Sequence, residues 1–163
     1  MSATVKTNTK GLDDLRTRLR KLDGLRLTLG FQGSKGITLY ENGANVATVA
    51  FWQEFGTIDI PARGFLRSTM VEQSGAIARA FAVELAGVFD RKRDPVEALA
   101  AVGATIAKMI KRKIDTSRSW ATPNAPSTIA KKGDDYPLHE SDLMSESVTY
   151  AVRRGASILK EGP

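Results

Sequence analysis

The sequence contains no cysteine and only one histidine, His139, among its 163 residues. A chain without cysteine forms no disulfide, uses no thiolate in catalysis and holds no metal through sulfur. A zinc site or a His-based nucleophilic site usually needs more than one histidine. We therefore expect no cofactor, no bound metal and no enzymatic reaction. We interpret His139 as an incidental surface residue, with an assisting acid–base role as the alternative.

Long apolar runs are also missing. No stretch approaches the roughly 20 apolar residues that cross a bilayer, and the longest weakly charged stretch, residues 76–89, contains Arg79 and Glu84. The first residues lack the basic-then-apolar pattern of a signal peptide. These absences predict a soluble protein without membrane contact, made in a reducing cytoplasm.

Two patterns of catalytic or phosphate-binding sites are incomplete. Residues 30–33, Gly-Phe-Gln-Gly, lack the spacing and the Lys-Ser/Thr ending of a phosphate loop. The acidic pairs at 13–14 and 134–135 are neighbours in sequence, which rarely converge on one metal, so we assign them no catalytic role. A small hydrolase is therefore disfavoured.

The composition is that of one globular domain, with 42% hydrophobic and 26% charged residues. The net charge is +6, from 24 basic and 18 acidic residues. This excess indicates either a solvated basic surface or contact with nucleic acid or an acidic protein ring. It is not concentrated in one tail, which weakens the case for nucleic acid.

Periodicity predicts an α+β domain, with a small antiparallel sheet packed against long amphipathic helices. We expect a flexible arm over residues 1–10, the domain over 11–155 and a short C-terminal tail over 156–163. A hairpin over residues 25–40 and a last strand over 148–152 would form the sheet. Helices are predicted at residues 12–23, 44–55, 65–88 with a bend near Gly75, 95–115 and 127–132.

The helix from Pro95 has the strongest local signal. Asp94 can cap its first amide groups, Pro95 suits the first helical position, and Glu97 can complete a capping box. The pattern places Leu99, Val102, Ile106, Ile110 and Ile114 inward. It places four basic residues toward water: Lys108, Lys111, Arg112 and Lys113. These residues form either a solvated helix face or a candidate DNA-facing surface.

The most informative stretch is residues 54–67, E-F-G-T-I-D-I-P-A-R-G-F-L-R. It predicts a helix end, a break at Gly56, an extended bridge over 58–60 and a new helix after Pro61. Arg63 and Arg67 would lie one helical turn apart and project together. Arginine suits bidentate contact with carboxylates across a subunit boundary.

A second stretch lies far downstream, P-N-A-P-S-T-I-A-K-K-G at residues 123–133, followed by Pro137-Leu138. Together the two segments resemble a family of tailed-bacteriophage virion-morphogenesis proteins, the tail-completion or neck proteins that join head to tail. The chain departs from the family in two places. Gly64 stands where proline is frequent, and Glu140-Ser141-Asp142 replaces an Asp-Thr-Gly turn.

The resemblance implies a structural virion protein at the neck or tail top, assembled in the bacterial host cytoplasm. It would form a ring of its own copies, a hexamer or alternatively a dodecamer. Its neighbours would be neck, connector or tail-terminator proteins, with non-specific contact to passing DNA. The alternative is a basic nucleic-acid-binding protein. The residues expected at subunit or partner contacts are Phe55, Gly56, Pro61, Arg63, Phe65, Arg67 and Trp120; for Trp120, a cover over the core is the other interpretation.

The ring hypothesis predicts that replacing Arg63 and Arg67 together with alanine disrupts the assembly. Sizing of the purified assembly is the measurement. Unchanged rings and normal virions would contradict this role.

Overall fold

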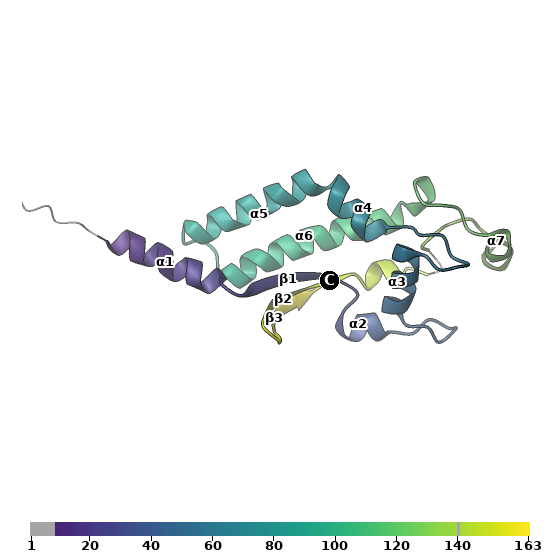
Figure 1. Ribbon diagram of the computed structural model, residues 1–163, viewed down its shortest axis with the longest axis horizontal. Coiled ribbons are helices and arrows are strands. Elements are labelled where there is room, and N and C mark those ends of the chain that lie inside the picture. Colours follow the sequence, from purple (N-terminus) through teal and green to yellow (C-terminus); the bar gives the residue numbers. More distant parts are fainter. Residues whose placement is uncertain (1–8, 140) are drawn as a thin grey trace, which may run out of the picture.

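The computed structural model describes residues 9–139 and 141–163 and has an α+β fold. In Figure 1 the long helix α6 runs between helix α5 on one side and a three-stranded sheet on the other. The elements in the described residues are α1 (Lys10–Leu22), β1 (Leu25–Gly30), α2 (Gly33–Ile37), α3 (Val46–Phe55), α4 (Phe65–Glu72), α5 (Ser74–Phe89), α6 (Pro95–Asp115), a short 3-10 turn (Ser117–Ser119), α7 (Pro126–Lys132), α8 (Leu143–Glu146), β2 (Thr149–Arg154) and β3 (Ser157–Gly162).

The sheet is antiparallel with the order β1-β2-β3. Strand β1 pairs with β2, so that Leu27 lies opposite Val152, and β2 turns directly into β3. The antiparallel sheet is confirmed, but two predictions about its strands are wrong. Residues 33–37 form α2 instead of joining a hairpin, and Leu39 makes only an isolated bridge to Asn45. The expected tail forms β3.

Helix α6 begins and packs as predicted. Asp94 Oδ1 accepts hydrogen bonds from the amides of Val96 at 2.8 Å and Glu97 at 3.4 Å. The predicted capping box is not completed: the carboxylate of Glu97 is engaged by Lys160 of β3 instead, so it ties the helix start to the sheet. All five residues predicted to point inward are buried: Leu99, Val102, Ile106, Ile110 and Ile114.

The remaining predicted helices are present, except that one of them is divided into two. The expected helix over 65–88 is two helices, α4 and α5, which separate at Gln73 near the predicted bend. Helix α7 ends at Gly133, whose φ of 81° is the left-handed conformation that favours glycine. Residues 1–8 of the expected N-terminal arm lie outside the described residues. None of the described helices combines the length and apolarity needed to cross a membrane.

The sheet approaches α6 closely at Gly103. A Cβ atom built on Gly103 would lie 2.7 Å from the ring of Tyr150 and 2.8 Å from Cδ1 of Leu27. Because both neighbours stand on the sheet and pack into the core, neither has room to withdraw. The absence of a side chain at Gly103 therefore sets the distance between helix and sheet.

Gly103→Ala is expected to lower the free energy of unfolding by about 1–3 kcal/mol, because overpacking outweighs the gain in helix propensity. Urea denaturation followed by circular dichroism measures the change. Gly75→Ala is the matched control, since its Cβ would meet only Arg79 Nη1 at 3.6 Å. Equal stability of the two variants would contradict the proposed close packing.

Candidate functional site

The two stretches singled out in the sequence meet at one place. We call residues 54–67 the first segment and residues 123–133 the second segment. Arg63, from the loop before α4, reaches across and donates from Nε to the carbonyl of Thr122 at 2.8 Å. Its Nη2 donates to the carbonyl of Pro123 at 3.1 Å and to Oδ1 of Asn124 at 3.2 Å. One guanidinium therefore joins segments about 60 residues apart in the chain.

Arg63 is almost fully buried, with 4% of its surface exposed. Its Nη1 donates to Oε1 of Gln53 at 2.6 Å, and its own amide donates to the carbonyl of Gln53. Burial lowers the pKa of the Arg63 guanidinium, and the nearby charge of Asp135 partly offsets that effect. Asp135 also accepts from the amide of Asn124, so the network continues into the second segment.

Glu54 is the second buried charge of this site, with 2% exposed. Its carboxylate accepts from the backbone amides of Leu66 at 2.8 Å and Arg67 at 3.1 Å. These are amides of the first turn of α4, which otherwise lack a helical partner. Arg67 Nε adds an ion pair at 3.0 Å. The end of α3 thus caps the start of α4, and the negative charge complements the helix dipole.

The loop between α3 and α4 folds back tightly. Gly56 has a φ of 80°, and a Cβ there would lie 2.9 Å from the amide nitrogen of Ala62. The Oγ1 of Thr57 accepts from the amides of Asp59 and Ile60, and its amide donates to the carbonyl of Ile60. The predicted extended bridge over residues 58–60 is therefore wrong. Backbone hydrogen bonds close this stretch into a turn.

The prediction that Arg63 and Arg67 project from one helical face is also wrong. Helix α4 begins at Phe65, so Arg63 lies before it and turns inward. Arg67 points outward, with 63% of its side chain exposed, and its guanidinium lies 5.3 Å from the ring centroid of Phe55. Phe65 is fully buried, edge-to-face with Phe31, whereas Phe55 and Pro61 are exposed.

Trp120 covers the core beside the end of α6. Its Nε1 donates to the carbonyl of Lys113 at 2.9 Å, and the Lys113 ammonium lies 4.4 Å from its ring centroid. Lys113 also pairs with Glu72 of α4. Lys113 is therefore engaged internally, while Lys108, Lys111 and Arg112 are exposed on α6.

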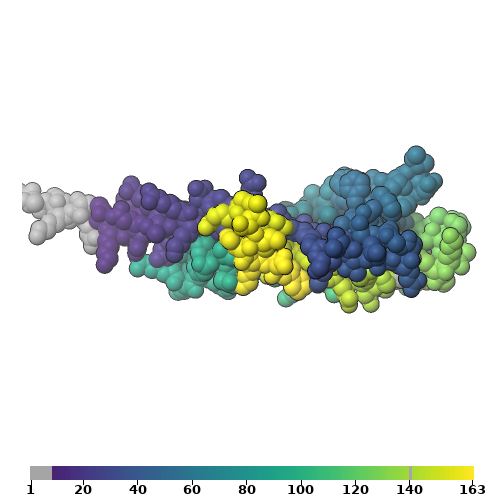
Figure 2. Space-filling model, turned by 90° about the horizontal axis from the view of Figure 1, so that it is seen from below, coloured from purple at the N-terminus to yellow at the C-terminus, as the bar shows by residue number. Residues whose placement is uncertain are grey.

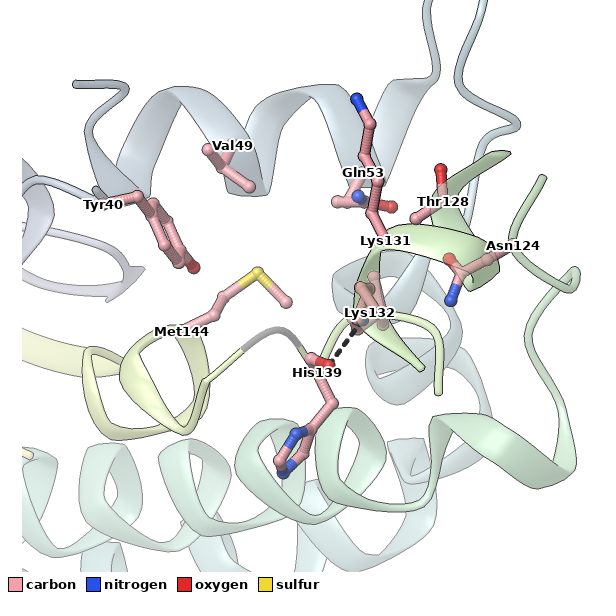
Figure 3. Close-up of a pocket in the computed structure, with 10 residues that line it drawn as sticks. Tyr40, Val49, Gln53, Asn124, Thr128, Lys131, Lys132, His139 and Met144 are labelled. Atoms are coloured by element: carbon pink, nitrogen blue, oxygen red, sulfur yellow. Dashed lines mark hydrogen bonds between the residues drawn. The ribbon is translucent and has the colours of Figure 1, made fainter. Parts of the chain in front are cut away.

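A pocket of about 170 Å³ lies between α3 and the second segment. Figure 3 shows Gln53 on α3 across from Lys131 and Lys132 on α7, with Met144 on the opposite wall. Lys132 Nζ donates to the carbonyls of Tyr136 and His139, and this closes the pocket floor. The lining combines an ammonium group, amide groups and an apolar wall, which suits a polar side chain of a partner.

His139 lies at the edge of this pocket and is paired locally. Its Nε2 is 2.9 Å from Oδ1 of Asp142, and its ring stacks on Tyr136 with centroids 4.4 Å apart. Within residues 9–139 and 141–163, no group of three or more acidic, histidine or cysteine side chains is placed to hold a metal ion.

Several residues of this site were missed by the sequence analysis. No local sequence pattern marks Gln53, Asn124 and Asp135. Their role in the hydrogen-bond network depends on the position of the Arg63 side chain in the folded chain. Glu54 carried a signal that was overlooked: it is the one acidic residue in the otherwise uncharged α3. An isolated charge in an otherwise uncharged, apolar helix, when buried, usually has a specific partner.

Comparisons of the chain with protein-family models, with curated proteins and with solved structures give no match.

Arg63→Ala is expected to lower the free energy of unfolding by more than about 2 kcal/mol, because it removes four part-buried hydrogen bonds and the packing of a buried side chain. Arg67→Ala removes an ion pair in which the arginine is exposed and the Glu54 carboxylate is buried; because Glu54 keeps two amide donors, the expected cost is smaller, about 1–2 kcal/mol. Urea denaturation of each single variant measures the difference. A loss from Arg67→Ala as large as that from Arg63→Ala would contradict the central role of Arg63.

Proposed function

We propose that the chain is a structural virion protein of a tailed bacteriophage that completes the tail or neck and joins head to tail as part of an oligomeric ring. One observation carries the proposal. The two segments that resemble the neck-protein family are far apart in the sequence, yet Arg63 ties them into one hydrogen-bonded site. Two independent similarities that belong to one structural unit support a common origin for that unit.

The two departures from the family pattern are compatible with this proposal. Gly64 has a φ of −58°, a value that the proline frequent in the family also adopts. Asp142 has a φ of −67° and lies in the right-handed region, so no glycine is needed at that position. The backbone at Gly64 therefore suits the family pattern, whereas the turn near Asp142 is built differently.

The structure changes which residues of the first segment can contact a neighbouring subunit. Arg63, Phe65 and Gly56 maintain the shape of the site. Phe55, Pro61 and Arg67 are exposed beside it and remain available. We therefore assign the proposed subunit contact to the exposed set.

A basic nucleic-acid-binding protein is the second candidate. It is favoured by Lys108, Lys111 and Arg112, which are exposed along one stretch of α6. Such a surface would neutralise phosphates without reading sequence. In the ring proposal the same surface would lie near passing DNA and bind it loosely.

The neck proposal predicts that the purified full-length chain forms a closed ring, with a hexamer favoured over a dodecamer. Native mass spectrometry gives the copy number, and electron microscopy gives the symmetry. Duplex DNA titrated at several salt concentrations is the parallel measurement. A stable monomer whose DNA affinity falls steeply with salt would favour the nucleic-acid-binding alternative.

A further inference from the structure

Helix α1 carries an apolar stripe that the described residues 9–139 and 141–163 leave largely uncovered. Leu12, Leu15 and Leu19 lie at helical spacing on one face and are 51%, 39% and 48% exposed. No residue of α1 is buried. Figure 1 shows α1 extending from one end of the molecule, beyond the sheet. We call these three residues the leucine stripe.

Polar contacts hold α1 in this position. Arg18 donates to the carbonyl of Val88 at the end of α5, and Asp14 pairs with Arg91 in the following loop. At the other end of the helix, Arg154 of β2 donates to the carbonyl of Lys21. Because these contacts leave the leucines exposed, the stripe is presented outward by a helix that is already in place.

A second exposed apolar surface lies around α3. Phe51, Trp52, Phe55 and Ile58 are 59%, 37%, 56% and 102% exposed, and the rings of Phe51 and Phe55 pack with centroids 4.8 Å apart. We call these four residues the aromatic patch. In Figures 1 and 2, α1 lies at one end of the molecule and α3 toward the opposite end. Exposed clusters of this kind mark protein contacts more often than chance.

The charges around the two surfaces are opposite. Helix α1 contains five basic and two acidic residues, a net charge of +3. Residues 41–67, which include the aromatic patch, contain three acidic and two basic residues. Arg63 is buried, and Arg67, beside Phe55, pairs with the buried carboxylate of Glu54. Glu41 and Asp59 are exposed, so these two carboxylates are the charges of this stretch that can meet the basic helix.

We propose that the leucine stripe of one copy docks on the aromatic patch of the next copy. This inference rests on the proposed ring and names the two faces that build it. A contact between different faces of identical subunits is heterologous, and repeated contacts of that kind close into a ring when the rotation allows. Aromatic side chains bury roughly 150–250 Å² each, so the patch can form the apolar core of an interface with a charged rim.

Disulfide cross-linking tests the contact directly, because the natural chain has no cysteine. Arg16→Cys stands beside the leucine stripe, and Ile58→Cys stands at the edge of the aromatic patch. The two full-length variants are mixed and oxidised. The expected main product is a dimer between the two variants, with little dimer when either is oxidised alone. Dimers formed by Arg16→Cys alone would show an α1–α1 contact and overturn the proposal.

A charge substitution gives a second, independent measurement. Leu15→Glu should weaken association roughly tenfold or more, because docking would bury an unpaired carboxylate. Val83→Glu on α5 is the matched control, since Val83 is 70% exposed and lies outside both surfaces. It should leave association unchanged. Equal loss in both variants, or in neither, would overturn the docking.

The outcomes separate this contact from the ring itself. An oligomer in native mass spectrometry without the mixed cross-link would overturn the docking and leave the ring proposal in place. A chain that stays monomeric at high concentration, without a cross-link, would overturn both.

Discussion

The apolar face of α6 is the constraint on which the rest of the structure depends. Ile106, Ile110 and Ile114 can leave water only if other elements cover them. Helices α4 and α5 pack on one side, and the sheet packs on the other at the distance that Gly103 allows. The elements at the two ends of the molecule are joined to this central helix or to the elements that pack on it.

At the end of the molecule that carries α3 and α4, two buried charged residues, Glu54 and Arg63, hold the loops in place through hydrogen bonds. Glu54 accepts from two free amides of α4, and Arg63 donates to the carbonyls of Thr122 and Pro123 at the start of the second segment. Desolvating such groups is costly, and the cost is offset only when each has several partners in good geometry. The requirement for partners makes the loop conformation specific.

The separation of buried from exposed residues also determines which side chains a partner could contact. Residues that carry the internal network are buried, and the exposed residues beside it are aromatic or charged, as at Phe55 and Arg67. The opposite end presents leucines on α1. An elongated subunit with different apolar surfaces at its two ends is suited to contacts between unlike faces. Such contacts are what a ring of identical subunits requires.

The sequence alone determined the elements whose signals are local. The cap at Asp94, the apolar period of α6 and the end of α7 at Gly133 depend on residues within a few positions of one another, and each was predicted correctly. Only the tertiary structure decided that β1 pairs with β2, more than 100 residues away, and that Arg63 turns inward to Thr122 and Pro123. Strand pairing and burial depend on which distant residues become neighbours. No local pattern carries that information.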